Sequence, residues 1–190
     1  MRVISGCARG TVLFAPSGAH TRPTANRIKE DMFNIIAPQL TGARFLDLFS
    51  GTGQIGIEAL SRGALSAVFV ESDKKAADII RKNIIKCRLD KPKSAILICA
   101  DVTNTLQKLA TSGQTFDIVF IDPPYDSDEL SKTAAALTTL HLLSDTATII
   151  TEQPASIPQK DLPGLHTYRL KKYTTTRLTF MRLETTCTTE

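Results

Sequence analysis

The sequence predicts an α/β fold built on a doubly wound, mostly parallel sheet with an antiparallel edge strand. Three observations support this prediction. A glycine-rich turn joins an apolar run to a helical pattern within residues 45–64, strand and helix patterns then alternate to about residue 150, and two strand patterns follow each other at the end. When strands and helices alternate along the chain, each helix crosses over between two strands, and these strands pair in parallel. Two strands that follow each other directly pair antiparallel. We expect one domain over residues 1–190, with an N-terminal extension (1–40) and a core (41–190).

The N-terminal extension combines an extended segment with a helix. Residues 2–6 and 10–14 predict a short β-hairpin whose connection carries Arg9. Apolar side chains at helical spacing, Ile28, Met32, Ile35 and Ile36, predict a helix over about 24–38. Arg22 and Arg27 bracket its start, where free backbone amides favour anions. We expect a phosphate contact here; the alternative is an ordinary amphipathic helix with charged flanks.

The glycine-rich turn is the stretch around which the core is organised. The run Phe45-Leu46-Asp47-Leu48-Phe49 leads into Ser50-Gly51-Thr52-Gly53-Gln54-Ile55-Gly56, and helical spacing continues beyond it. In nucleotide-binding folds the first two glycines of this pattern let a ligand lie against the backbone, and the third lets helix and strand pack closely. A second apolar run, residues 67–70, ends in Glu71, where a ribose-binding carboxylate is expected.

Asp47 bears on which nucleotide is bound. It lies inside the strand that leads into the turn, where dinucleotide sites are usually apolar. A carboxylate at this place would repel a pyrophosphate but attract a cation such as the amino group of a methionyl moiety. The sequence therefore favours S-adenosylmethionine over NAD. Alternatively, Asp47 accepts hydrogen bonds from the amides of the loop, which is compatible with the same ligand.

The rest of the core continues the alternation. Residues 76–87 predict a helix, 95–99 a strand, 106–109 a short helix, 130–137 a helix and 147–150 a strand. Residues 116–121 are so continuously apolar that they predict a central strand of a parallel sheet. Residues 165–171 and 177–183 are the two consecutive strands at the end of the chain.

The run Asp122-Pro123-Pro124-Tyr125 stands at the carboxyl end of the predicted central strand. This is the ligand side of an open parallel sheet. Proline has no amide hydrogen, so the run offers the Asp122 carboxylate and the Pro123 carbonyl as acceptors beside an aromatic ring. Such a group suits a planar base with an exocyclic amine, which the acceptors would orient while Tyr125 stacks on the base. Alternatively, the two prolines only end the strand.

The distribution of charge indicates which class of partner the protein binds. The net charge is +4, and residues 1–100 hold 15 Lys and Arg against 8 Asp and Glu, whereas residues 101–163 hold 3 against 9. A basic N-terminal part fits a nucleic-acid partner, although charged runs are often only solvated faces.

The four cysteines are scattered without metal-ligand spacing, so we expect no metal. No apolar run is long enough for a membrane span, and we expect a cytoplasmic monomer.

Several motifs carry a resemblance to a known family. The glycine turn together with Asp122-Pro123-Pro124-Tyr125 is similar to S-adenosylmethionine-dependent amino-methyltransferases of DNA and RNA. The blocks Ile4-Ser5-Gly6-x-x-Arg9-Gly10, Thr21-Arg22-Pro23-Thr24-x-Asn26-Arg27 and Gly56-x-Glu58-Ala59-Leu60-Ser61-Arg62-Gly63-Ala64 resemble the RsmD family of 16S ribosomal RNA guanine-N2 methyltransferases. The resemblance covers nearly the whole chain. It implies a Rossmann-like class I methyltransferase that modifies one guanine of the assembled or assembling small ribosomal subunit.

The resemblance also assigns residues. It implies that Asp47 and Gly51 hold the methionyl end of S-adenosylmethionine, that Glu71 binds the ribose, and that Asp101 binds the adenine amino group, although Asp101 is equally placed to cap a helix. The predicted cofactor-binding set is Asp47, Ser50, Gly51, Gly53, Glu71, Asp101 and Asp122; the catalytic set is Asp122, Pro123 and Tyr125; and the RNA-binding set is Arg9, Arg22 and Arg27.

Three other functions compete with this prediction. A DNA adenine methyltransferase would share the Asp-Pro-Pro-Tyr run but generally needs an added target-recognition segment, for which the chain has no room. An NAD-dependent oxidoreductase is disfavoured by Asp47. A silent RNA-binding module would not need the complete run from Asp122 to Tyr125.

Overall fold

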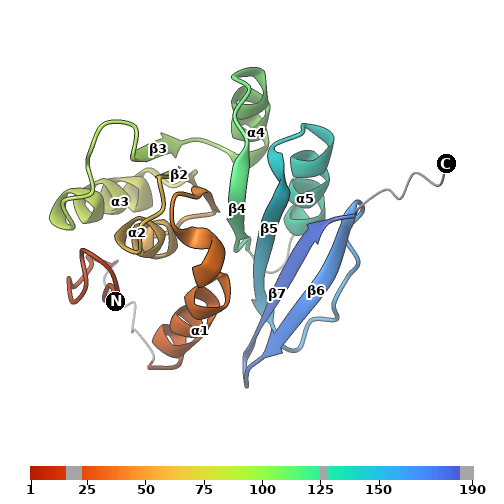
Figure 1. Cartoon of the computed structure of the whole chain (residues 1–190), viewed down its shortest axis with the longest axis horizontal. Coiled ribbons are helices and arrows are strands. Elements are labelled where there is room, and N and C mark those ends of the chain that lie inside the picture. Colours follow the sequence, from red (N-terminus) through yellow and green to blue (C-terminus); the bar gives the residue numbers. More distant parts are fainter. Residues whose placement is uncertain (16–22, 125–127, 185–190) are drawn as a thin grey trace.

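The computed structural model describes residues 1–15, 23–124 and 128–184. Its centre is a seven-stranded sheet in the order β3-β2-β1-β4-β5-β7-β6 (Figure 1). The strands are β1 (Arg44–Leu48), β2 (Ser66–Glu71), β3 (Ala95–Cys99), β4 (Phe116–Ile121), β5 (Leu143–Pro154), β6 (Leu165–Lys172) and β7 (Thr176–Leu183). The first five are parallel, and β7 pairs antiparallel with both β5 and β6. The predicted fold class is confirmed, with β4 at the centre of the sheet.

Helices cover both faces of the sheet. They are α1 (Pro23–Leu40), α2 (Gln54–Ser61), α3 (Lys74–Lys86), α4 (Val102–Thr111) and α5 (Glu129–Thr139). Side chains of α1, α2 and α3 form one buried cluster with one face of the sheet, and side chains of α4 and α5 form a second cluster with the other face. Alternate residues of β1 divide accordingly: Phe45 belongs to the first cluster, and Leu46 and Leu48 belong to the second.

The hairpin and the ends of several elements differ from the sequence prediction, and the helix predicted over 106–109 is longer, at Val102–Thr111. The two arms of the N-terminal hairpin run antiparallel, but they share only the isolated bridge Arg2↔Val12 and form no regular strands. Helix α1 continues through Pro38 to Leu40, whose side chain is buried in the core. Helix α2 already ends at Ser61, before Ala64. Strand β5 runs to Pro154 instead of Ile150 because its second half pairs with β7, and the apolar pattern did not reveal this pairing.

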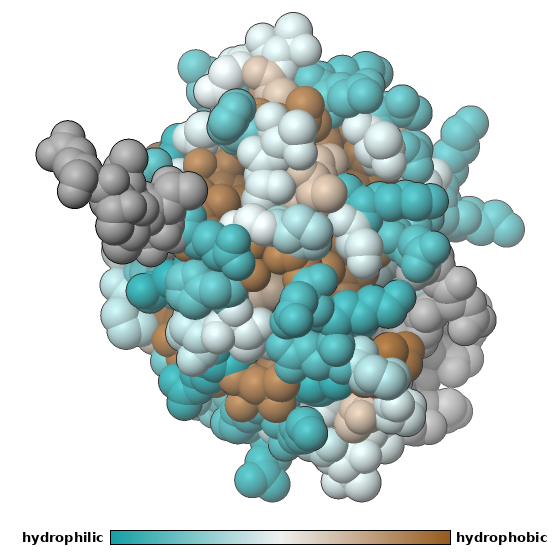
Figure 2. All heavy atoms as spheres, turned by 90° about the vertical axis from the view of Figure 1, so that its right-hand side faces the viewer, coloured by the Kyte–Doolittle hydropathy of each residue, from teal (hydrophilic) through white to brown (hydrophobic). Residues whose placement is uncertain are grey.

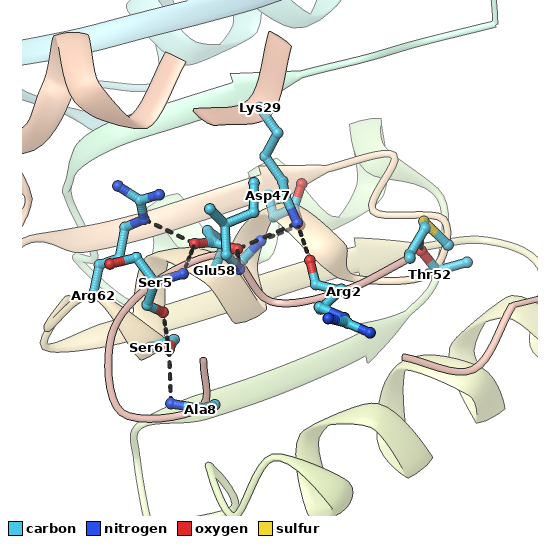
Figure 3. A network of polar contacts seen from close by, with 12 residues as sticks. Arg2, Ser5, Ala8, Lys29, Asp47, Thr52, Glu58, Ser61 and Arg62 are labelled. Atoms are coloured by element: carbon cyan, nitrogen blue, oxygen red, sulfur yellow. Dashed lines mark hydrogen bonds and ion pairs between the residues drawn. The ribbon is translucent and has the colours of Figure 1, made fainter. Parts of the chain in front are cut away.

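The N-terminal segment is fastened to α2 by Glu58. This carboxylate is fully buried and accepts hydrogen bonds from the backbone amides of Ile4 and Ser5, at 2.8 and 2.9 Å (Figure 3). It also pairs with Lys29 of α1 at 3.2 Å and with Arg62 at 2.8 Å. The motif from Gly56 to Ala64 that marks the resemblance thus contains the residues that hold the extension in place.

Gly6 lets the same segment approach α2 closely. A Cβ atom at Gly6 would lie 1.7 Å from the backbone oxygen of Ser61, and its φ is +80°. Ser61 itself is bonded on both sides: its carbonyl accepts from the Cys7 amide, and its Oγ donates to the Ser5 carbonyl and accepts from the Ala8 amide. Only glycine fits both the backbone conformation and the space at this position.

On the side of the molecule that carries β6, apolar patches are small and interrupted by hydrophilic side chains (Figure 2). Tyr168 and Leu170 of β6 are among the exposed large apolar residues. Within the described ranges, no helix is both long and apolar enough to cross a bilayer.

Candidate functional site

The glycine turn lies between the end of β1 and the start of α2. Gly51 has a φ of +55°, and a Cβ atom there would meet nothing within 4 Å, so space is open beside its backbone. At Gly56 a Cβ atom would lie 2.3 Å from the ring of Phe69 in β2. Gly51 therefore leaves room for a ligand, and Gly56 permits the close packing of helix on strand that the sequence predicts.

Asp47 lies beneath this turn. Its side chain is 1% exposed, and one carboxylate oxygen accepts a hydrogen bond of 2.9 Å from the Gly56 amide. Burial raises the pKa of Asp47 to about 8, against the effect of that hydrogen bond, and the nearby carboxylates of Asp122 and Glu71 raise it further. The alternative proposed from the sequence, a bond to the amides of the loop, is thus present. A cation placed beside Asp47 would favour its charged form.

Glu71 and Ser50 join the turn to β2. The Glu71 carboxylate accepts from the Gly51 amide at 2.7 Å and from the Asp73 amide at 2.9 Å. The Ser50 hydroxyl donates to the Asp47 carbonyl and accepts from the Val70 amide. Ser50 is buried, so its side chain organises the turn. Glu71 is half-buried and has acceptor capacity left for a ligand.

Asp101 is the N-cap of α4. Its carboxylate accepts a hydrogen bond of 3.2 Å from the Asn104 amide, and its side chain is exposed. The cap role considered from the sequence is therefore present in the structure. Asp101 stands after β3, the outermost strand on this side, and one carboxylate oxygen makes the cap contact.

Asp122 and Pro123 follow β4 at the same edge of the sheet. Asp122 is half-buried and Pro123 is buried. Burial raises the pKa of Asp122 to about 6. The β1–β4 register pairs Asp47 with Phe120, two positions before Asp122, and the Asp122 carboxylate adds to the effect of burial in raising the pKa of Asp47. Tyr125, predicted to stack on the base, lies outside the described residues.

Sequence reasoning missed Glu152. This residue lies in β5, and burial raises its pKa to about 7, with Asp122 adding to the effect. The apolar pattern predicts a strand that ends at Ile150, whereas β5 continues to Pro154 and includes Glu152. An acidic residue two positions beyond a predicted parallel strand was the signal that could have identified it.

The turn between β6 and β7 meets α1 beside Glu152. The Tyr173 hydroxyl donates to the Asp31 carboxylate at 3.0 Å, and Lys171 pairs with the same carboxylate at 2.8 Å. The pKa of Tyr173 is raised above its usual range by burial first and then by Asp31, with a further contribution from Glu152. The hydrogen bonds from Lys171 and Tyr173 lower the pKa of Asp31, and Arg27 of α1 adds a smaller effect in the same direction.

Arg9 lies on a separate part of the N-terminal extension. It lines a hollow of about 300 Å³ together with Arg2, Asn26 and Glu30. Arg9 and Arg27 are both exposed. Of the three predicted RNA-binding arginines, Arg22 lies outside the described residues.

The edge of the sheet carries several carboxylates and few cations. Among the described residues, no ion pair involves Asp47, Asp122 or Glu152. Within the same ranges, no three His, Cys, Asp or Glu side chains are grouped so that they could hold a metal ion. The charge at this edge would best be balanced by a positively charged ligand.

Comparison with known proteins gives the family. The family model described as "Conserved hypothetical protein 95" matches residues 1–182. "Ribosomal RNA small subunit methyltransferase D" of Escherichia coli (strain K12) is 34% identical over 152 residues, which cover 80% of this chain and 74% of that protein. This chain belongs to the RsmD family. A further relative, "Putative rRNA methyltransferase YlbH" of Bacillus subtilis, is 36% identical over 86% of this chain and 88% of that protein.

Solved structures place this RsmD-family chain in the same fold. "Putative methyltransferase yhhF from Escherichia coli" has a TM-score of 0.83 at 30% identity and covers 97% of this chain and 98% of its own. The "putative methylase HI0767 from Haemophilus influenzae" has a TM-score of 0.76 at 27% identity, over 96% and 98% of the two chains. The Rossmann-like class I methyltransferase fold is thereby confirmed.

Proposed function

We propose that this protein transfers a methyl group from S-adenosylmethionine to the exocyclic N2 amine of one guanine in 16S rRNA. The observation that carries the proposal is the position of Asp122 and Pro123 at the end of β4, beside the buried Asp47 under an open glycine turn. Membership of the RsmD family supports the rRNA substrate, because several relatives are named as methyltransferases of small-subunit rRNA.

The residues fit S-adenosylmethionine. The open space at Gly51 allows a ligand to lie against the backbone, and the carboxylates of Asp47 and Glu71 flank it. Asp47 would hold the ammonium group of the methionyl end and Glu71 the ribose hydroxyls. When bound, the cofactor supplies an electrophilic methyl group on a positively charged sulfur, and its two cationic centres would offset the carboxylates of this edge. A pyrophosphate would instead add negative charge there.

The chain's own part in the reaction is to orient and activate the amine. The lone pair of an amine attached to a purine ring is delocalised, so the nitrogen is a poor nucleophile. The Asp122 carboxylate and the Pro123 carbonyl would accept the amine hydrogens, which fixes the nitrogen and raises its electron density. We assign Tyr125 to stacking on the extruded base. The Asp101 carboxylate oxygen that does not cap α4 would accept a hydrogen bond from the adenine amino group of the cofactor.

The N-terminal extension would bind the RNA backbone. Arg9 with Arg2 lines the hollow of the extension, and Arg27 lies towards Tyr173 and the site. Arginines at these two places are suited to successive phosphates of one RNA strand. Glu58 holds the extension rigidly against α2, so the arginines have a fixed relation to the glycine turn.

The decisive experiment compares small-subunit rRNA from cells with and without the protein. We expect one N2-methylguanosine to disappear in its absence, and purified protein with labelled S-adenosylmethionine to restore that nucleoside in the deficient subunits. Asp47→Asn should weaken cofactor binding by about 1–3 kcal/mol, the scale for losing a charge-assisted hydrogen bond. N6-methyladenine as the product would overturn the proposal and favour an adenine methyltransferase instead.

A further inference from the structure

The registers of β2, β1, β4 and β5 place the carboxylates of Glu71, Asp122 and Glu152 at one level of the sheet edge, with Asp47 two positions below that level. Asp47 pairs with Phe120, Ile121 pairs with Thr151, and Phe69 pairs with Asp47. Phe69, Phe120 and Ile150 all belong to the core cluster under α1 and α2. Because side chains alternate along a strand, the residues two positions beyond each of these three face the same way. They are Glu71, Asp122 and Glu152.

Across the sheet, the four carboxylates follow the order of the strands. Glu71 of β2 comes first, then Asp47 of β1, Asp122 after β4 and Glu152 of β5. Their effects on one another agree with this order: Glu71 and Asp122 act on the pKa of Asp47, and Asp122 acts on that of Glu152. If the cofactor lies over Glu71 and Asp47 and the methyl group is received at Asp122, Glu152 lies on the far side of the transfer point, where the target base must be.

Glu152 differs from Glu71 in how its carboxylate is occupied. The Glu71 oxygens accept two backbone amides. The Glu152 carboxylate accepts no hydrogen bond and forms no ion pair within residues 1–15, 23–124 and 128–184, and it remains partly exposed. A half-buried carboxylate without donors is costly unless a ligand provides them.

We propose that Glu152 determines the specificity for guanine by accepting hydrogen bonds from N1–H and from one N2–H of the target base. The inference rests on the proposed function. The two donors lie side by side on the Watson–Crick edge of guanine, where one carboxylate can accept both. Glu152 shares the N2 hydrogen on this edge with the Asp122 carboxylate, and the second N2 hydrogen, which points towards the sugar edge, is left to the Pro123 carbonyl.

This arrangement rejects the other bases by repulsion. Adenine and cytosine each present a ring-nitrogen acceptor where guanine presents N1–H, so a carboxylate would face a lone pair. Uracil has the ring N–H but carries carbonyl oxygens on both sides of it and no amine. Such bases leave the buried acceptors of the site without hydrogen-bond donors. Unpaired buried acceptors give the strongest discrimination that a hydrogen-bonding pocket can achieve.

The test uses 2-aminopurine, which keeps the 2-amine but has an acceptor at N1. Small subunits are assembled from ligated 16S rRNA that carries either guanine or 2-aminopurine at the nucleotide that the wild-type protein methylates. Wild type, Glu152→Gln and Glu152→Asp are compared by kcat/KM on both substrates. Asp145→Asn, which changes an exposed carboxylate at the other end of the same strand, is the matched control.

We expect wild type and Asp145→Asn to prefer guanine strongly. Glu152→Gln should lose about 10- to 100-fold on guanine, the range for one bidentate base contact. It should gain on 2-aminopurine, because the glutamine amide donates to N1 while its carbonyl accepts from the amine. Glu152→Asp should keep the preference at a reduced rate. Binding of S-adenosylhomocysteine should be unchanged in all variants, which also reports that they fold.

Two results would contradict the assignment in different ways. If wild type methylates guanine and Glu152→Gln keeps the same ratio between the two bases, Glu152 does not read the base and the proposed function stands. If wild type methylates no guanine in these subunits, the proposed function is wrong, and so is the role proposed for Glu152.

Discussion

The Nζ of Lys29 lies 3.2 Å from the Oε2 of Glu58, and both side chains are almost completely buried. Burial lowers the pKa of Lys29, whereas its pairing with Glu58 acts in the opposite direction. The pair connects α1 to α2, and the same carboxylate holds the amides of Ile4 and Ser5. One buried ion pair therefore fixes both parts of the N-terminal extension to the core.

Removing the charge of Glu58 should destabilise the protein strongly. Glu58→Gln leaves Lys29 charged and without its counter-ion in the core, a situation that costs about 3–5 kcal/mol. The measurement is the free energy of unfolding from urea denaturation. Asp78→Asn is the control, because it breaks the exposed pair with Arg81 and should change stability by less than about 1 kcal/mol. Equal changes in the free energy of unfolding for the two substitutions would show that the buried pair stabilises the protein no more than the exposed pair.

Gly6→Ala should be far more harmful than Gly10→Ala. Both glycines have a positive φ, +80° and +86°, so each alanine bears a similar backbone strain of about 1–2 kcal/mol. Only at Gly6 does the new Cβ also meet the backbone oxygen of Ser61, at 1.7 Å, whereas at Gly10 it meets nothing within 4 Å. Hydrogen exchange of the Cys7 and Ala8 amides, which bond to Ser61, should therefore accelerate in Gly6→Ala alone. Similar exchange in both variants would contradict the close packing.

Stability should fall as the pH rises from about 5 to 8. Asp47, Asp122 and Glu152 have pKa values of about 8, 6 and 7 in the folded protein, well above their ordinary values. The unfolded state has already released these protons, because the ordinary pKa values are 3.8 for the two aspartates and 4.5 for Glu152, whereas the folded state keeps each proton until its raised pKa is reached. The free energy of unfolding therefore decreases by up to about 1.4 kcal/mol per pH unit for each group that is still protonated in the folded state. Thermal unfolding across this range gives the slope. Asp47→Asn should flatten it, and an unchanged slope in this variant would show that Asp47 does not titrate there.

Asp122→Ala should abolish turnover while the cofactor and RNA still bind. The interaction with the amine matters most as the nitrogen attacks, so kcat should fall and binding should not.

Tyr125→Phe keeps the ring and should retain most activity, whereas Tyr125→Ala should lose about 1–3 kcal/mol of base stacking. Single-turnover rates and equilibrium binding of S-adenosylhomocysteine separate these effects. A Tyr125→Phe variant as inactive as Tyr125→Ala would implicate the hydroxyl instead.

Replacing Arg9, Arg22 and Arg27 together by alanine should weaken RNA binding and reduce its salt dependence. For each phosphate that is no longer neutralised, the slope of the logarithm of the binding constant against that of the salt concentration should become shallower by about 1. Affinity for S-adenosylhomocysteine should barely change. Arg81→Ala on α3 is the control, because this exposed arginine pairs with Asp78 of the same helix. If the triple variant and the control bind RNA alike, the arginines are only solvated.

The sequence by itself determined the order and type of the core elements. The apolar run over 116–121 predicted a central strand, and β4 occupies that place. The glycine pattern and the position of Asp122 predicted which edge of the sheet carries the site. These features are local, since strand and helix periods and turn residues are encoded within about ten neighbouring positions.

The tertiary structure decided what depends on residues far apart in the chain. Glu58 meets Ile4 across 54 positions, so the sequence showed Glu58 as part of a motif but not as an anchor. Glu152, which we propose as part of the site, lies in a strand because β7 pairs with β5 beyond its apolar half, and no pattern near Glu152 encodes that pairing. Strand pairing between distant segments is set by the packing of the whole sheet, and the parallel pairing of β4 with β5 brings Glu152 next to Asp122.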